Sequence, residues 1–280
     1  MMKNRKVNSR EYKVMLKHKK FKGDKDELLK QAKKFWQTFS DAIADVVSET
    51  DDKFKKPEKQ LVRFYDTKKE ILNSNSYVFR ERKDIDGENR EMTLKFRHRD
   101  RYLSQARDMK DKDGKDKEQK FEEDIKPKTF VSLYSFSNKT IIKKDKKLNK
   151  LNDPGRLFPD LPKRLGDDYN DDKKIKIVND FTAYQIVLKG PHFTIANKEC
   201  KCALIFWYDK KPNGKPVVAE FSFKYKDNND KSESEKFSSE LAQKAFDVFQ
   251  ILHEDKNLGK WVDLKGTTKT AFAYEYSGKS

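Results

Sequence analysis

Apolar and polar residues alternate in many short runs along this chain, and such alternation is typical of β-strands that bury one face. In the run EMTLKFRHRD, Met92, Leu94 and Phe96 would face one side of a strand, while Lys95 and Arg97 would face the other. Comparable runs predict strands at residues 9–16, 61–66, 77–83, 91–99, 121–126, 131–142, 183–190, 192–196, 200–209 and 217–226. The pattern therefore predicts a large antiparallel sheet.

Two segments have the spacing of amphipathic helices instead. In residues 25–49, apolar side chains such as Leu28 and Phe35 recur three and four positions apart and form one stripe. Residues 234–253 show the same spacing, and the aromatic tail that follows is expected to form a short strand or to dock on the domain. The chain is thus predicted to be a single α+β domain covering residues 1–280.

Composition adds a strong positive charge to this picture. The 64 Lys and Arg residues exceed the 47 Asp and Glu residues by 17, so the surface should attract polyanions such as nucleic acid, phosphorylated metabolites or an anionic membrane. The alternative is that lysine is simply abundant in solvent-exposed loops. The net charge alone therefore does not identify a binding partner. A load of 20 Phe, 11 Tyr and 3 Trp argues against a disordered chain.

The Cys and His residues give little support for a disulfide or for a metal site with sulfur or imidazole ligands. Cys200 and Cys202 would face the same side of one strand, which is a poor geometry for a disulfide, and the four His are scattered. The N-terminal stretch lacks an apolar signal core, and no run approaches the roughly 18 apolar residues of a membrane span. We therefore expect a cytoplasmic protein that does not associate with membranes.

The charged faces of the strands carry the candidate chemistry. An ordinary sheet would turn them to solvent, and that reading explains any single strand. It explains less well the arginines and carboxylates that repeat two positions apart, because paired cations repel each other unless an anion lies between them. A closed barrel with its charged faces inward would instead surround a ligand. Phosphate-binding cations are then predicted at Lys13, Arg80, Arg82, Lys95, Arg97 and Lys139.

The carboxylates on these faces are hard oxygen ligands, which Mg²⁺ and Mn²⁺ prefer together with phosphate oxygens. Candidate metal ligands are Glu11, Glu122, Asp124 and Glu220. One alternative stays open in the run FEEDI, where a shift of one residue would put Glu123 inside the barrel in place of its neighbours. The ligand implied is a polyphosphate with a divalent cation.

The order of these motifs resembles the CYTH, or triphosphate tunnel metalloenzyme, superfamily. The matching pieces are SREYK (9–13), FYDT (64–67), VFRER (78–82), MTLKFR (92–97), EED (122–124), SNK (137–139) and VAEFSF (218–223). Each piece is weak alone, but seven in the right order are moderately specific. The resemblance implies a closed, antiparallel, eight-stranded β-barrel flanked by helices, with a loop insertion at about 143–174.

The resemblance also implies an activity, which is the divalent-metal-dependent hydrolysis of inorganic triphosphate or of a nucleoside triphosphate, with Glu11, Lys13 and Glu220 as catalytic residues. The cofactor would be Mg²⁺ or Mn²⁺. Two carboxylates of the family pattern are replaced by Ser9 and Ser222, and a hydroxyl does not supply their charge. The alternative is a weakened tunnel that binds a nucleotide or polyphosphate as a sensor. A nucleotide cyclase and a nucleic-acid-binding protein are further, less favoured readings.

Overall fold

The computed structural model of the protein contains a single large β-sheet, against which the helices pack. The structure describes residues 6–114, 119–125, 131–211, 214–226 and 237–278. The strands are β1 (Ser9–Met15), β2 (Glu49–Asp51), β3 (Glu58–Thr67), β4 (Tyr77–Asp84), β5 (Asn89–His98), β6 (Lys120–Ile125), β7 (Ser132–Lys143), β8 (Ile175–Ile177), β9 (Ala183–Ile195), β10 (Lys198–Tyr208) and β11 (Val218–Lys226). The sheet follows the order β2-β9-β10-β11-β1-β6-β7-β5-β4-β3-β8.

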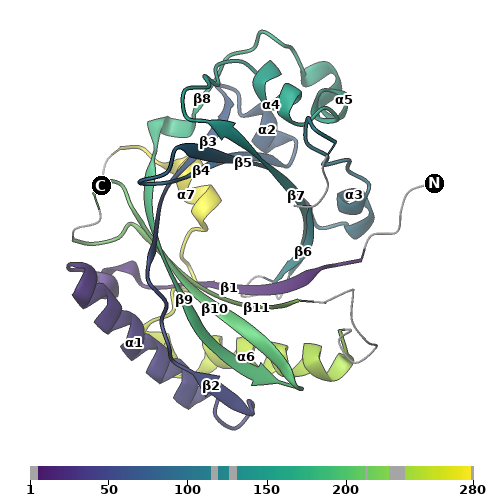
Figure 1. Ribbon diagram of the computed structural model, residues 1–280. Helices are drawn as coiled ribbons and strands as arrows, with labels where there is room; N and C mark the ends of the chain where they lie inside the picture. Colours follow the sequence, from purple (N-terminus) through teal and green to yellow (C-terminus); the bar gives the residue numbers. More distant parts are fainter. Residues whose placement is uncertain (1–5, 115–118, 126–130, 212–213, 227–236, 279–280) are drawn as a thin grey trace.

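An additional pairing of β3 with β9 brings the sheet back on itself. Nine strands, from β9 round to β3, form the resulting ring, and β2 and β8 extend it at the two sides of this junction (Figure 1). The expected set of eight antiparallel strands is not confirmed, because the ring has nine strands and β1 runs parallel to β6. An alternating sequence predicts which side chains share a face, but it does not predict the direction of the neighbouring strand.

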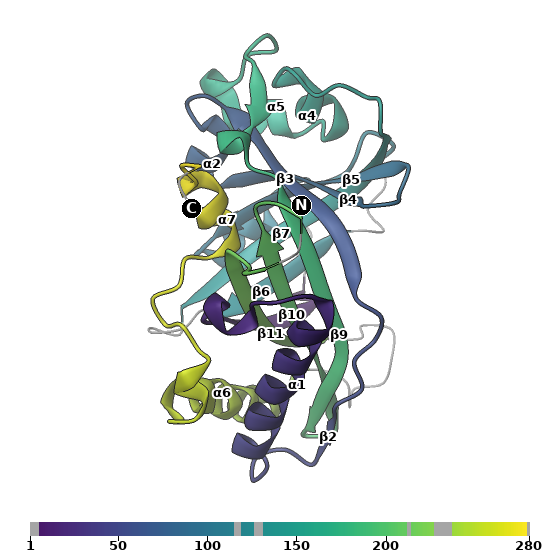
Figure 2. The same ribbon diagram turned by 90° about the vertical axis from the view of Figure 1, so that its left-hand side faces the viewer.

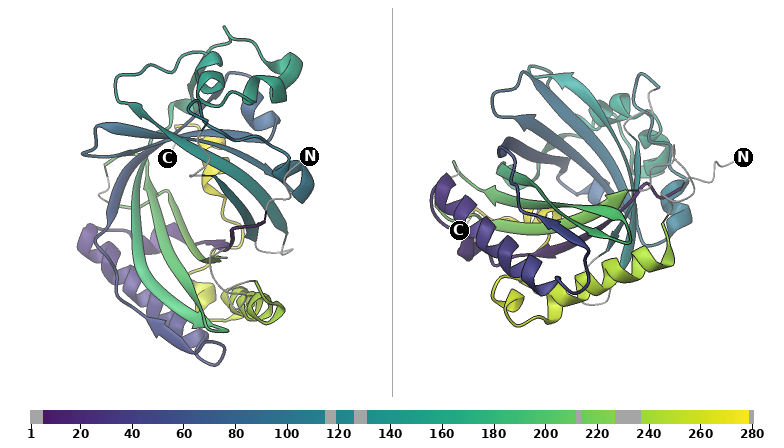
Figure 3. Two further views of the ribbon diagram at one scale, coloured as in Figure 1. Left: turned by 45° about the vertical axis from the view of Figure 1, so that its right-hand side comes forward. Right: turned by 60° about the horizontal axis from the view of Figure 1, so that its bottom comes forward.

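Helices cover the outer face of the ring, except the last one along the chain, which projects across its opening. They are α1 (Lys25–Ala42), α2 (Ile71–Ser74), α3 (Arg101–Gln105), α4 (Asn152–Leu157), α5 (Leu161–Leu165), α6 (Ser239–Glu254) and α7 (Lys269–Glu275). Helices α1 and α6 lie against the part of the sheet formed by β9, β10 and β11, as both views of Figure 3 show. Figure 1 places α2, α4 and α5 outside the opposite part of the ring.

Apolar residues on the outer faces of the strands form two cores beneath these helices. Met92, Leu94 and Phe96 of β5 are almost fully buried in the core that also includes Phe158 and Leu161, from the region of α4 and α5. The apolar face of EMTLKFRHRD therefore points outward from the ring, which agrees with the prediction of a barrel that has its charged faces inward. Within the described residues, no helix is long and apolar enough to cross a membrane.

The short elements β2, β8 and α2 to α5 were not predicted from the sequence, and the bounds of two predicted elements differ for a clear physical reason. The first helix ends at Ala42 rather than near residue 49, because Val46–Val47 and Thr50 are β-branched and favour the extended chain that becomes β2. Strand β9 runs unbroken past Gly190, where φ is +124° and a Cβ would meet the Lys53 carbonyl. Glycine therefore allows the strand to continue at a point where its sequence predicts a break.

The C-terminal tail forms a helix, α7, and not the short strand that was one of its two expected structures. In Figure 1 this helix projects across the opening of the ring, and in Figure 2 it lies at one end of it. The Tyr274 hydroxyl donates to the buried Asp66 carboxylate at 2.9 Å, and Ala273 packs in an apolar cluster with Phe64 and Trp207. Docking on the domain, the other expectation for this tail, is therefore confirmed.

Candidate functional site

The interior of the ring contains a cavity of about 300 Å³. Its charged lining consists of Lys13, Arg80, Arg82, Lys95, Arg97 and Lys269, together with Asp124, Glu220 and Asp263. Among the described residues, six cations thus face three carboxylates, so the cavity has an excess of three positive charges and is suited to a polyanion. The region next to these groups is apolar and is formed mainly by Met15, Val62, Phe64, Val78, Trp207 and Leu264.

The parallel pairing of β1 with β6 places two carboxylates opposite each other, since Glu11 is in register with Asp124. Opposed carboxylates repel unless a cation lies between them. The Lys13 ammonium does so, at 2.9 Å from Glu11 Oε2 and 2.9 Å from Asp124 Oδ1. Burial would raise the pKa of Glu11, but the charge and hydrogen bond of Lys13 together with the charge of Lys224 outweigh it and lower that pKa to about 2. Both carboxylates therefore carry negative charge, and Lys13 supplies one positive charge between them.

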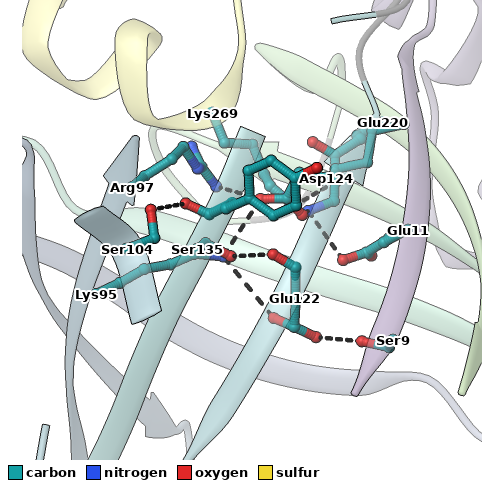
Figure 4. A network of polar contacts seen from close by, with 12 residues as sticks. Ser9, Glu11, Lys95, Arg97, Ser104, Glu122, Asp124, Ser135, Glu220 and Lys269 are labelled. Atoms are coloured by element: carbon teal, nitrogen blue, oxygen red, sulfur yellow. Dashed lines mark hydrogen bonds and ion pairs between the residues drawn. The ribbon is translucent and has the colours of Figure 1, made fainter. Parts of the chain in front are cut away.

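Asp124 is the central acid of the site, and its side chain is only 2% exposed (Figure 4). It accepts a hydrogen bond from Arg97 Nη2 at 3.0 Å, and Lys95 Nζ lies 3.5 Å from the same oxygen. Burial would raise the pKa of Asp124, but Lys13, Lys95 and Arg97 together hold it well below its usual range. Three cations share the single carboxylate of Asp124, so its charge does not offset the effect of burial at Lys95. Burial therefore lowers the pKa of Lys95 to about 8.

The arginines of β4 have few partners. Within the described ranges Arg80 forms no salt bridge, and its Nη2 reaches only the Thr93 hydroxyl, at 3.4 Å. Burial, and next the charge of Arg82, lowers the pKa of Arg80 to about 9. The buried Nε atoms of Arg80, Arg82 and Arg97 find no hydrogen-bond acceptor in the part of the chain that the structure describes. The Nε atoms of Arg90 and Arg107, which do not line the cavity, also lack a described acceptor, so it is the grouping of three such donors around one cavity that favours an anion there.

Other residues predicted for the site lie inside the ring but do not line the cavity. Lys139 donates to Glu91 at 2.9 Å, and Glu91 is also 3.7 Å from Arg82. Glu122 accepts a hydrogen bond from the Ser9 hydroxyl at 3.0 Å (Figure 4). Glu11 also lies outside the cavity lining, beside Lys13.

The register of β6 excludes the alternative left open by the sequence. Glu123 points to the other face of the strand, where its carboxylate binds Arg10 at 2.8 Å and accepts a hydrogen bond from Ser132 at 2.6 Å. Glu122 and Asp124 therefore keep the inner face of β6, which is the register in which they were predicted as site residues.

Sequence reasoning missed Lys269, which comes from the C-terminal segment. Its Nζ lies 2.6 Å from Oε1 of Glu220, whose side chain is only 5% exposed. Figure 4 shows this lysine reaching from the helix above the site towards Glu220. Burial lowers the pKa of Lys269, and the charge of Glu220 partly offsets this effect. The tail KGTTKTAFAYEY has no alternation or motif that marks Lys269, so only the fold identifies it.

The expected Mg²⁺ or Mn²⁺ site can be tested against this donor set. Each of the four predicted ligands lies within 4 Å of a side-chain ammonium: Lys13 for Glu11, Lys95 for Glu122, Lys13 and Lys95 for Asp124, and Lys269 for Glu220. No group of three or more His, Cys, Asp or Glu residues that could hold a metal is found among the described residues. The carboxylates as arranged do not fit a divalent cation, because lysines occupy the positions beside them.

Comparisons with known proteins give only distant structural similarities. No protein-family model matches the sequence, and no curated protein matches it. A candidate adenylyl cyclase from Hippeastrum, described with a dominant triphosphatase activity, is similar in structure at 12% identity and a TM-score of 0.45, over 95% of each chain. A candidate adenylate cyclase from Bacillus halodurans is similar at 10% identity and a TM-score of 0.38, over 97% of this chain and 100% of that one. At these sequence identities and TM-scores, the similarities support no conclusion about the activity of this chain.

Proposed function

We propose that this chain is a divergent member of the triphosphate tunnel superfamily and binds the triphosphate group of a small molecule inside its ring of strands. The observation that carries this proposal is the set of buried arginine donors without acceptors, with Arg80 as the clearest case. Guanidinium groups bind phosphate oxygens through paired hydrogen bonds, so a polyphosphate would supply the missing acceptors. The seven ordered motifs of the sequence support the same ligand.

The position of the cations favours a small molecule over nucleic acid. Arg80, Arg97 and Lys95 lie on the inner face of the ring, around a cavity of about 300 Å³. That volume suits a small ligand, whereas a nucleic-acid duplex needs its cations on an open surface. The apolar residues beside the cations, including Phe64 and Trp207, leave room for an organic substituent on the triphosphate. Both inorganic triphosphate and nucleoside triphosphates therefore belong among the ligands to test.

Isothermal titration calorimetry of the full chain with tripolyphosphate and with ATP, in buffer containing Mg²⁺, tests the proposal. We expect one site per chain with a micromolar or lower dissociation constant for at least one of the two. An affinity that falls steeply with salt and is matched by single-stranded nucleic acid of equal charge would instead favour the nucleic-acid reading. No binding of either triphosphate would refute the proposed function.

Hydrolysis of the bound triphosphate is a second candidate function. Asp124 lines the cavity and keeps its carboxylate ionised, so it can accept a hydrogen bond from a water molecule next to the bound phosphate. The surrounding cations would neutralise charge on the phosphoryl oxygens, which is the main requirement of phosphoryl transfer. Release of phosphate in the presence of Mg²⁺ or Mn²⁺ measures this activity. Faster release by a Ser9→Glu variant would identify a weakened enzyme, and unchanged, negligible release would identify a binding protein.

Binding should be accompanied by proton uptake at alkaline pH. The lowered pKa of Lys95, about 8, leaves this side chain mostly neutral in the empty cavity at about pH 9, and a bound polyanion raises that pKa again. Near pH 7 the ammonium is already formed, so no proton should enter there. Titrations in buffers of different ionisation enthalpy measure the uptake. A Lys95→Met variant should take up clearly fewer protons than wild type at pH 9, and the remainder should come from Arg80, whose pKa is lowered to about 9. Uptake equal to that of wild type would show that Lys95 does not supply it.

A further inference from the structure

The residues expected to bind a metal ion are altered in this chain, whereas the residues expected to bind phosphate are present. Two family carboxylates are replaced by Ser9 and Ser222, which are both buried on the inner faces of β1 and β11. The carboxylates that remain are each next to a lysine, as described above. The donor set has thus lost the charge of two carboxylates, and Lys269, which belongs to none of the matched family pieces, lies beside Glu220 at the place where a divalent cation would bind.

The structure holds Lys269 in its position by several independent contacts. Tyr274 of α7 donates to Asp66, and the Asn179 side-chain amide donates to the carbonyls of Ala273 and Tyr274 at 3.2 and 2.6 Å. Asp66 is itself fixed, because its carboxylate accepts backbone N–H groups at the start of α2. These contacts lie on the helix that carries Lys269, so the lysine is a built part of the cavity lining and not a mobile side chain of a loose tail.

Lys13 and Lys269 are paired with three of the inner carboxylates. Lys13 lies between Glu11 and Asp124, and Lys269 pairs with Glu220 on the neighbouring strand β11. An incoming polyanion would be repelled by these three carboxylates if they were unpaired. In metal-dependent sites of this chemistry, the divalent cation removes that repulsion by binding carboxylates and phosphate together.

We propose that Lys269, together with Lys13, takes the electrostatic place of the divalent cation, so that this cavity binds a triphosphate without a metal. The inference rests on the proposed triphosphate binding and adds the identity of the counter-cation. It assigns the C-terminal segment a direct part in the binding site, with Lys269 as a binding residue that balances Glu220 and faces the phosphate group.

Calorimetric titration with tripolyphosphate in the presence of EDTA tests metal independence in the full-length protein. We expect the wild-type dissociation constant in EDTA to lie within about threefold of the value in Mg²⁺, which is less than 1 kcal/mol of binding free energy. Binding in Mg²⁺ that disappears in EDTA would overturn this inference and leave the proposed function standing. Absence of binding under both conditions would refute the proposed function itself, so the two failures are distinguishable.

A substitution at Lys269 tests the residue assignment. Lys269→Met should weaken binding in EDTA by about tenfold and should make binding respond to Mg²⁺, because Glu220 then lacks its counter-charge. Lys265→Met is the matched control, since Lys265 lies in the same segment, is exposed and does not line the cavity. Lys269→Arg keeps the charge and should keep metal-free binding, which also checks that α7 still docks. Equal affinities of the Lys269→Met and Lys265→Met variants in EDTA would contradict the assignment.

Discussion

An Arg80→Met variant is expected to lose triphosphate binding by about 100-fold while gaining thermal stability. The loss follows because a guanidinium that donates to phosphate contributes about 1.5–3 kcal/mol through charge-assisted hydrogen bonds. The gain follows because Arg80 is a half-buried cation beside Arg82, with no salt bridge among the described residues. Methionine keeps most of the side-chain volume, so the change removes charge without opening a large cavity.

The opposite signs of these two effects separate a binding role from a structural one. Calorimetry with tripolyphosphate measures the affinity, and differential scanning calorimetry of the ligand-free protein measures the melting temperature. Arg63→Met is the matched control on the neighbouring strand β3, because Arg63 faces outward and its Nη1 lies 3.2 Å from the buried Glu81 carboxylate. Removing Arg63 should lower the melting temperature and leave the affinity unchanged. If Arg80→Met lowers stability and keeps full affinity, Arg80 is a structural residue.

The alternation of the strands predicted which side chains enter the ring, and this was the most reliable part of the sequence analysis. Arg80, Arg82, Lys95 and Arg97 line the cavity because a strand turns every second side chain to the same face, whatever its neighbours are. The same local rule placed Met92 and its apolar companions outside. Face assignment needs only the residue order within one strand, and a single sequence contains that information.

Pairing between distant segments could not be predicted in the same way. The parallel contact of β1 with β6 joins residues more than 100 positions apart, and it alone brings Glu11 opposite Asp124 with Lys13 between them. Lys269 reaches Glu220 only because α7 docks at the end of the ring. Both contacts depend on which elements pack together, and alternation or helical period carries no signal for that choice. The expectation of free metal ligands arose from the charged strand faces, which place Lys13 and Lys95 inside the ring but do not show that these lysines pair with the carboxylates.

An Asp124→Asn variant should show the reverse behaviour to Arg80→Met, with lower stability and tighter binding of the anion. Asp124 is buried and balances Lys13, Lys95 and Arg97, so neutralising it leaves buried cations without their counter-charge and should cost about 3 kcal/mol of unfolding free energy near pH 7. Its depressed pKa gives a direction for pH as well. The stabilisation is present above the unfolded pKa of about 4 and is lost as pH falls through the lower folded value, so the difference from wild type should shrink in acid.

The same substitution should strengthen tripolyphosphate binding in EDTA by about tenfold, because three cations become available to the ligand and one repelling carboxylate is removed. Urea unfolding and calorimetric titration measure the two quantities on the same preparation. Glu123→Gln is the matched control, since Glu123 belongs to the same strand but pairs with Arg10 on the opposite face. It should cost some stability and leave binding unchanged. Weaker metal-free binding by Asp124→Asn would show that this carboxylate holds the cations in their binding positions, and would contradict the view that it competes with the ligand for them.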